Sequence, residues 1–381
     1  MSKRSAVAVA CVLFFGYGLI LSGLGPALPE LAARTASSLA DLGGIFTALF
    51  FGALVTQLVT GPITDRVGQR PVMLVGLLLL VLGTFGATRS HLLFLTFSSM
   101  VFAGLGGGTL VVTNNLLAAQ LFPERNRSVL NLVNVFYGIG AVLGPMLAGQ
   151  SLRLFGTALL SAWAGAALLL LLLGAIVRLP DVHTSAHEAA PAQARPVWQS
   201  PALWRLGALA LLYGGMETGI GGWATVYMQR TTAQDGATAA LTASAFWLAL
   251  TGGRMIGTFA GMRITSTTML TICIGLTLGG ALLLRAGIGN ALFSSAAVVI
   301  IGLAFGPIYP TALAVTTATF RRGTGTATSV VMALASTGGM IVPWLLLVLL
   351  ERGPAFSTLL IVAGAVSMLA LHIGRGLSGS E

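Results

Sequence analysis

The sequence predicts an all-α membrane protein with twelve transmembrane helices in two six-helix bundles. Hydrophobic residues make up 56% of the 381 positions and charged residues only 8%, and the mean hydropathy is +0.92. A soluble domain carries about a quarter charged residues, because these cover its surface. Most of the surface of this chain must therefore face hydrocarbon. We expect a multi-pass protein of the cell (inner or plasma) membrane, with the lipid bilayer as its first partner.

Apolar stretches long enough to cross a bilayer follow one another along the whole chain. A spanning helix needs roughly 20 apolar residues. The run after Lys3 and Arg4 is too long for a secretory signal and is interpreted as the first, uncleaved helix. The predicted spans cover 6–30, 41–62, 71–88, 92–121, 128–151, 156–178, 203–229, 238–261, 266–284, 288–319, 325–350 and 354–374.

The net charge of +10 indicates topology and not a nucleic-acid partner. With the N-terminus in the cytoplasm, thirteen Lys and Arg residues fall in inside segments. Only six fall in outside segments: Arg34, Arg89, Arg153, Arg230, Arg285 and Arg352. This excess follows the positive-inside rule, so both termini are predicted to be cytoplasmic.

A linker and an internal repeat divide the chain into two halves. Residues 179–201 are rich in Ala, Pro, His and charge, which is typical of a flexible linker between 1–178 and 202–381. With six helices each, the halves would be related by a pseudo-two-fold axis along the membrane normal. An offset of 198 pairs Gly104 with Gly302, Leu105 with Leu303, Gly108 with Gly306, Phe122 with Phe320, Gly140 with Gly338 and Pro145 with Pro343. An offset of 196 pairs Tyr17 and Gly18 with Tyr213 and Gly214, Gly25 with Gly221, and Gly61 with Gly257. Easy self-matching of a glycine-rich chain is the alternative explanation.

The loop between the second and third spans carries a recognisable motif. It reads GPITDRVGQRP over residues 61–71 and resembles the G-x-x-x-D-R-x-G-R-R signature of the major facilitator superfamily, with Gln69 in place of one basic residue. The resemblance implies a transporter whose halves alternate access to a central site. An acid there can cap or pair with arginines at neighbouring helix ends, which would hold the halves together. We expect a conformational latch at Gly61, Asp65, Arg66, Gly68 and Arg70, an ordinary charged loop being the alternative.

Three stretches of the second half resemble the fucose-permease-like branch of sugar transporters. They are residues 213–227, residues 246–257 and residues 307–311. Fucose permease is a proton symporter with carboxylates in its first and fourth helices. Here the first span has no acid before Glu30, and the fourth presents Asn114 and Asn115. Proton coupling through those positions is therefore unavailable.

Glu217 is the one carboxylate placed well inside a predicted span. A charge at that depth costs at least a few kcal/mol unless it faces a cavity, finds a partner or is protonated. We expect Glu217 to bind substrate hydroxyls and to take up the coupling proton, a neutral structural Glu being the alternative. Arg254 is the one basic residue well inside a span. It lies roughly 11 Å from the inner end of its helix and Glu217 roughly 20 Å from the inner end of its own, so their pairing is left open and Arg254 is grouped with the latch.

Amides and aromatic rings complete the candidate substrate site. Amides and phenols both donate and accept hydrogen bonds without fixed charge, which suits sugar hydroxyls, and aromatic rings stack on apolar sugar faces. Bonding between helices is the alternative role for each residue. The predicted substrate-binding residues, besides Glu217, are Tyr17, Asn114, Asn115, Asn131, Asn134, Tyr137, Tyr213, Trp223, Tyr227, Trp247 and Tyr309.

The predicted function is uptake of a small polar solute, a sugar or polyol, by alternating access with proton symport. An exporter of drug-like or organic solutes, a sodium-coupled carrier and an uncoupled facilitator are the alternatives within transport. An intramembrane enzyme is disfavoured because H-E-x-x-H, G-x-S-x-G and P-loop motifs are absent from the sequence. We expect a monomer without cofactor, metal or nucleic acid. A channel would not require two halves, and a ligand receptor without transport is an alternative that flux measurements would separate.

Overall fold

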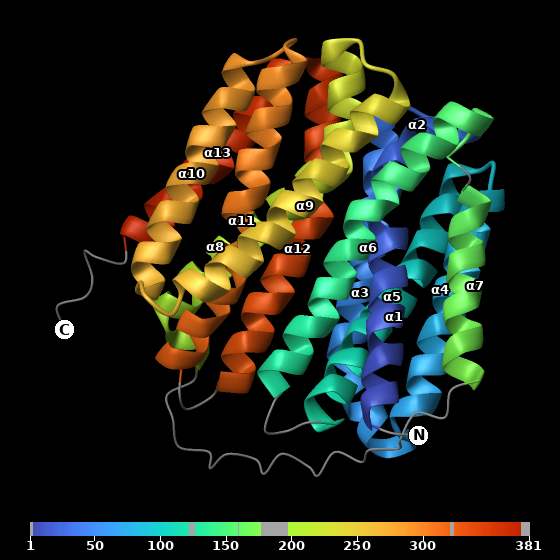
Figure 1. Ribbon diagram of the computed structural model, residues 1–381, viewed down its shortest axis with the longest axis vertical. Helices are drawn as coiled ribbons and strands as arrows, with labels where there is room; N and C mark the ends of the chain where they lie inside the picture. Colours follow the sequence, from blue (N-terminus) through green and yellow to red (C-terminus); the bar gives the residue numbers. More distant parts are fainter. Residues whose placement is uncertain (1–2, 122–125, 159, 177–196, 321–323, 375–381) are drawn as a thin grey trace. The chain divides into compact units, whose positions relative to one another are not determined.

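The structure, a computed structural model, describes residues 3–121, 126–158, 160–176, 197–320 and 324–374. This part of the chain is almost entirely helical and contains no strand. Figure 1 shows long helices running side by side within each half of the chain. The helices are α1 (Lys3–Ser22), α2 (Leu24–Thr35), α3 (Leu39–Val67), α4 (Gln69–Arg89), α5 (Leu93–Leu121), α6 (Asn126–Phe155), α7 (Leu160–Ile176), α8 (Pro201–Thr232), α9 (Gly236–Ala260), α10 (Ser266–Ala286), α11 (Ala291–Thr319), α12 (Thr324–Arg352) and α13 (Pro354–Ile373), with a 3-10 turn η2 (Val197–Gln199) before α8.

The first predicted span, 6–30, is two helices instead of one. The break falls at Gly23, whose N–H donates to the Leu19 carbonyl at 3.2 Å to close α1. Pro26 and Pro29 follow within α2. A proline has no N–H for the i→i−4 ladder, so an unbroken helix through this stretch would lose its regular bonding. The described chain therefore has thirteen α-helices, and α1 and α2 together fill the first span.

Local signals fix the ends of α3. Its start is a capping box, in which the Asp41 N–H donates to Ser38 Oγ at 3.1 Å and the Ser38 N–H donates to Asp41 Oδ2 at 3.1 Å. Its end is Gly68, with φ 88° and an N–H that donates to the Thr64 carbonyl at 2.9 Å. A positive φ of this size favours glycine, which explains the glycine between α3 and α4.

Nine of the helices in the described chain are long and apolar enough to cross a membrane. They are α1, α3, α4, α5, α6, α10, α11, α12 and α13. Helix α7 has only 17 described residues, of which Gly165–Gly174 are the most apolar. Helices α8 and α9 are long but rich in Gly and Thr, and they carry Glu217 and Arg254. The candidate site thus lies on two long helices outside this set of nine.

The chain forms two compact units. One unit comprises residues 1–187 with 236–244, and the other comprises 188–235 with 245–381. In the first, α1 packs against α5, α6 and α7, and α4 packs against α5 and α7. In the second, α8 packs against α11, α12 and α13, and α10 packs against α11 and α13. The second unit repeats the helix pairing of the first in the same order. Of the predicted linker, 179–201, residues 179–196 lie outside the described chain, and the boundaries of the two halves remain a prediction.

Equivalent glycines make equivalent close contacts in the two units. A Cβ on Gly18 would overlap the Tyr137 carbonyl, and a Cβ on Gly214 would meet the Ala335 carbonyl at 2.6 Å. Gly18 and Gly214 are 196 residues apart, and their contact partners, Tyr137 and Ala335, are 198 residues apart. These separations are the two offsets of the sequence repeat. Matching contacts join Gly104 to Leu49 and Gly302 to Phe246, and Gly140 to Phe15 and Gly338 to Leu211. The glycines let paired helices touch backbone to backbone, as small residues do in membranes.

Candidate functional site

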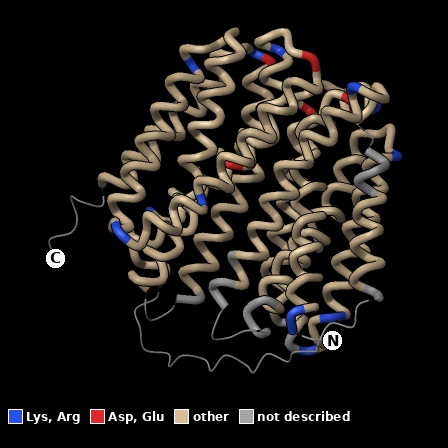
Figure 2. Tube along the Cα trace, viewed as in Figure 1, with Lys and Arg blue, Asp and Glu red and all other residues tan. Residues whose placement is uncertain are grey.

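A half-buried ion pair forms the centre of the second unit. Arg254 Nη2 on α9 donates to Glu217 Oε1 on α8 at 3.0 Å, with side chains 28% and 17% exposed. Figure 2 shows that most other charged residues gather near the helix ends. The pairing that the sequence left open is therefore present. The sequence argument compared the distances of Glu217 and Arg254 from the inner ends of their helices. It assumed that these two ends lie at the same level, and it ignored the reach of the long arginine side chain.

Close packing of α8 against α12 determines where Glu217 points. A Cβ on Gly215 would meet the Gly338 carbonyl at 2.8 Å, and a Cβ on Gly219 would meet Leu346 at 2.7 Å. The glycine face of α8 is thus occupied by α12. Glu217 lies between these glycines in sequence but on another face of the helix, because successive positions turn by about 100°. It faces α9, where Arg254 meets it.

Glycines on α9 and α11 bring Arg254 to the pair. A Cβ on Gly306 would overlap the backbone of Gly253 and Arg254, and it would meet the Leu250 carbonyl at 2.6 Å. A Cβ on Gly253 would overlap the Leu303 carbonyl in turn. The backbones of α9 and α11 therefore touch next to Arg254, and a larger residue at Gly306 would displace it.

Three aromatic rings border the ion pair. Tyr213 lies one helical turn before Glu217, so both share a face of α8. Its ring stacks on Tyr309 with centroids 5.6 Å apart and an angle of 11°, and it tilts against Phe305 at 5.3 Å. The Tyr213 hydroxyl lies close enough to interact with both Glu217 and Arg254. It is fully buried, yet it makes no hydrogen bond of standard geometry within the described chain. The site thus offers an acid, a base, a phenol and an aromatic surface.

The other aromatic residues predicted in the second unit, on α8 and α9, pack against rings of the protein. Trp223 and Tyr227 stack with centroids 4.1 Å apart and are 1% and 0% exposed. Trp247 on α9 packs edge-on against Phe246 at 5.4 Å, and its ring fills the space beside Gly221. The indole N–H groups of both tryptophans are buried without a hydrogen-bond partner among the described residues. Their predicted stacking on a substrate remains a prediction, since here they stack on protein.

In the first unit the structure brings two of the predicted polar residues together. The rings of Tyr17 on α1 and Tyr137 on α6 lie 6.1 Å apart. Asn114 is fully buried, and its Nδ2 donates to the Ala10 carbonyl at 3.0 Å, which joins α5 to α1. The side-chain oxygens of Asn114 and Asn115 are buried without a partner in the described chain. Such oxygens are unusual and fit a site that a ligand completes.

Helix α6 places fewer polar residues at the candidate site than the sequence predicted. Asn134 is exposed, and its Nδ2 donates to the Leu130 carbonyl of its own helix at 2.8 Å. The side chain of Asn131 lies outside the described part of the chain. Of the three polar residues predicted along this helix, Tyr137 alone is placed by the structure beside another candidate residue.

Comparison with known proteins identifies the family. The chain matches the Major Facilitator Superfamily over residues 10–343. It belongs to this superfamily. Over 98% of its length it has the fold of the transporter FucP in the outward conformation (TM-score 0.67, 16% identity, 99% of that chain) and of the nucleoside transporter NupG (TM-score 0.81, 12% identity, 99% of that chain). The chain is therefore a multi-pass membrane protein of this superfamily, as the resemblance implied.

Curated relatives match the chain over shorter stretches. The riboflavin transporter RibZ of Clostridioides difficile is 26% identical over 155 residues, 40% of this chain and 34% of RibZ. The multidrug resistance protein MdtL of Shewanella oneidensis is 31% identical over 137 residues, 36% of this chain and 34% of MdtL. The chain spans 22% to 34% of the length of such relatives. The names of these relatives differ in what the proteins carry, so they leave the function of this chain open.

The superfamily signature loop carries a contact that the sequence did not predict. Gln69 is 2% exposed, and its Nε2 donates to the Thr113 carbonyl on α5. The residue that departs from the signature thus ties the start of α4 to α5 within the first unit. Gly61 has open space around it, Arg66 is exposed and Arg70 is half-buried. The side chain of Asp65 lies outside the described chain, so the latch remains a prediction.

An apolar cavity in the first unit was also missed from sequence. It lies between α1, α2, α3, α4 and α5. Tyr17, Leu21, Leu49, Leu80 and Met100 are among the residues that line it. Hydropathy cannot predict such a cavity, because leucines that line a space and leucines that fill one look alike in sequence.

Proposed function

We propose that this transporter carries a small hydroxylated solute, a sugar or polyol, together with a proton, and that Glu217 takes up the proton. The observation that carries this proposal is the Glu217–Arg254 ion pair at mid-helix, 3.0 Å apart and bordered by Tyr213. A buried ion pair is sensitive to the loss of either charge, because the remaining charge is then buried without a partner. Protonation of Glu217 would have this effect.

The proposed cycle follows from the hydrogen-bonding capacity of these groups. With Glu217 ionised, its carboxylate holds the Arg254 guanidinium. When Glu217 is protonated, the pair weakens, and Arg254 can donate to a substrate hydroxyl while Glu217 donates to another. The partly exposed Tyr309 ring, which stacks on the buried Tyr213, would provide a surface for an apolar sugar face. Proton and solute would thereby favour the same state of the site, which is the thermodynamic basis of symport.

The test is flux in proteoliposomes driven by an imposed pH gradient. A thermal-shift screen against sugars, polyols, amino acids and cationic drugs first identifies a ligand. Glu217→Gln should abolish accumulation driven by acidification while solute exchange between equal concentrations persists. Glu351→Gln removes an exposed carboxylate of the same unit and should leave accumulation unchanged. Acid-driven accumulation by Glu217→Gln at the wild-type level would overturn the coupling role. Accumulation that depends on a sodium gradient and not on the pH gradient would show that sodium, and not the proton, is the coupling ion.

A second candidate function is export of an apolar organic solute. It is favoured by the apolar cavity in the first unit, which leucines and Met100 line around Tyr17. The similarity of one segment to the multidrug resistance protein MdtL also favours export. If export is the function, a lipophilic dye should stabilise the purified protein and be extruded from cells that express it. The sugar screen should then give no thermal shift.

The proposal also includes the topology of the chain, which follows from its charge distribution, and its oligomeric state. We place both termini in the cytoplasm, and we expect the transporter to act as a monomer in the cell membrane. Cysteine-accessibility labelling at the two chain ends, and the mass of the detergent-solubilised protein, test these two statements.

A further inference from the structure

Helix α2 forms part of the wall of the apolar cavity in the first unit. Leu24 and Leu31 of α2 line this cavity together with Leu80 of α4 and Met100 of α5. The two leucines of α2 are separated by two helical turns, so they share one face of the helix. Leu31 is 1% exposed. One apolar face of α2 therefore closes a side of the cavity.

Both ends of α2 are bends in the chain. At its start, Ser22 and Gly23 separate it from α1, and Pro26 has no N–H to donate to the Ser22 carbonyl. Gly, Ser and Pro are residues at which helices bend sharply. At its end, Ala36 has φ 51°, and its N–H donates to the Ala32 carbonyl. Hinges consist of a few residues at the ends of elements, so α2 is a helix of 12 residues with a candidate hinge at each end.

The Glu30 cluster, which consists of Glu30, Arg34, Thr157 and Ala158, joins α2 to the turn after α6. The Thr157 hydroxyl lies 2.9 Å from each carboxylate oxygen of Glu30, and the Ala158 N–H donates to Oε2 at 2.6 Å. Arg34 Nη2 donates to Glu30 Oε1 at 3.2 Å. Gly156, with φ 70°, follows the end of α6 and reverses the chain before the two donors. The carboxylate thus fixes α2 to a neighbouring turn on a face away from its two cavity leucines.

Arg34 also joins α2 to another helix of the cavity wall. Its Nη1 donates to the Thr88 carbonyl. Thr88 lies in the last turn of α4, where carbonyls have no partner within the helix and a positive charge is favourable. Thr88 lines the cavity as well. One arginine thus links the Glu30 cluster to the wall of the cavity.

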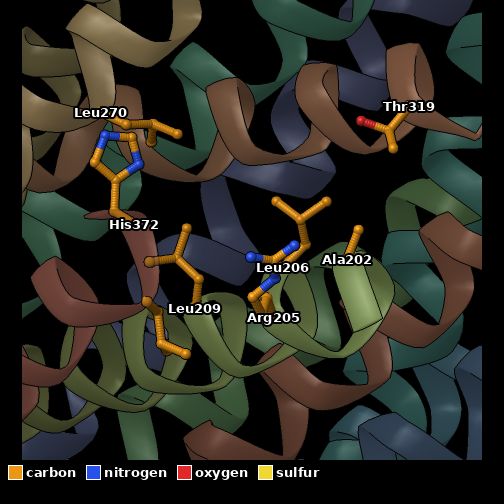
Figure 3. Close-up of a pocket in the computed structure, with 8 residues that line it drawn as sticks. Ala202, Arg205, Leu206, Leu209, Leu270, Thr319 and His372 are labelled. Atoms are coloured by element: carbon orange, nitrogen blue, oxygen red, sulfur yellow. The ribbon is translucent and has the colours of Figure 1, made fainter. Parts of the chain in front are cut away.

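A pocket in the second unit has no comparable cover. It opens between α8, α10, α11 and α13, and Figure 3 shows Arg205 and His372 beside its leucines. Each of these four helices is continuous over its whole length. A short helix between two bends is therefore a feature of the wall of the first cavity and not of this second pocket.

We propose that α2 is a movable cover of the apolar cavity, and that the hydrogen bonds of Glu30 and Arg34 hold it closed. Lipid tails are as apolar as leucine, so Leu24 and Leu31 lose little when an apolar molecule replaces their contacts. Hydrogen bonds to charged groups are stronger and depend on geometry. The polar contacts therefore decide whether α2 stays in place. Opening would admit a small uncharged molecule to the cavity, whichever solute the protein carries.

The test measures how fast N-ethylmaleimide, a small uncharged reagent, reaches a cysteine in the cavity. The full-length protein in detergent micelles carries Met100→Cys, and the two native cysteines, Cys11 and Cys273, are replaced by Ala. Glu30→Ala removes the carboxylate of the cluster and should raise the labelling rate about tenfold, as expected for the loss of one hydrogen bond to a charged group. Arg34→Gln should raise the rate in the same way.

A matched control removes a neighbouring charge outside the cluster. Arg89→Gln changes the exposed arginine that follows Thr88 in α4, and it should leave the labelling rate of Met100→Cys unchanged. Cys11 is buried in the same unit but does not line the cavity. In a protein whose only cysteine is Cys11, Glu30→Ala should therefore leave labelling unchanged.

A milder variant keeps the proposal testable if Glu30→Ala folds poorly. Thr157→Val removes one hydroxyl at nearly constant shape, and it should raise the labelling rate of Met100→Cys about threefold. Unchanged labelling of Met100→Cys in Arg34→Gln and Thr157→Val would overturn the proposal. An equal rise in Arg89→Gln, or an equal rise in the labelling of Cys11, would overturn it too, because the whole unit and not α2 would then have loosened.

Discussion

Removal of both charges of the Glu217–Arg254 pair should destabilise the protein by less than the sum of the two single removals. At 3.0 Å and an effective dielectric constant of ~20, the Coulomb attraction is about 5–6 kcal/mol. Desolvation of the two groups offsets most of this gain. With side chains 17% and 28% exposed, solvent screens the remainder, and a net coupling of about 1–3 kcal/mol is expected. The prediction is therefore a coupling energy of about 2 kcal/mol.

A double-mutant cycle on Glu217→Gln and Arg254→Gln measures this coupling. For a unit of this size, about 2 kcal/mol corresponds to a shift of ~4–8 °C in melting temperature. The double variant should melt higher than the sum of the two single losses predicts, because neither charge is left alone. Melting of the purified variants, followed by intrinsic fluorescence without added solute, reports these shifts. Losses that add within about 0.3–0.5 kcal/mol would show that the two charges are independent and would refute the reasoning.

The packing of the helices gives further predictions. Gly338→Ala should lower the melting temperature by several degrees, because the new Cβ would overlap the Leu211 carbonyl, whereas Gly275→Ala on α10 meets open space and should raise stability by about 0.5–1 kcal/mol. A melting temperature unchanged by Gly338→Ala would contradict the close contact of α8 with α12. Ser38→Ala removes the capping box of α3 and should cost about 1 kcal/mol, measured as the same thermal shift. Gln69→Leu removes the hydrogen bond to the Thr113 carbonyl and should cost about 1 kcal/mol, and a gain in stability would show that this bond contributes nothing.

The sequence predicted the helices and their repeat because these depend on local composition and on spacing. The glycine at offset 196 from Gly18 does make the matching helix contact in the second unit. The break at Gly23 was missed, since the apolar run continues across it and hydropathy averages over both sides. A window of roughly 20 residues cannot separate a straight span from a bent one.

The candidate site was predictable by residue type but not by contact. Glu217 and Arg254 stood out as charges inside spans, yet their pairing depends on how α8 and α9 lie against each other, which sequence spacing does not give. The burial of Trp223 against Tyr227 depends on tertiary packing in the same way. Neither pocket could be expected from the sequence, because a cavity is the space that side chains of distant helices leave unfilled.

Proton uptake coupled to solute addition tests the central claim most directly. Proteoliposomes in a weakly buffered medium that contains an external pH indicator, with no imposed gradient, receive the solute that the thermal-shift screen identifies. The external medium should become alkaline on addition of solute to the wild-type transporter and to Glu351→Gln, and it should remain unchanged for Glu217→Gln. Alkalinisation of equal size with Glu217→Gln would contradict the assignment of the coupling proton to Glu217.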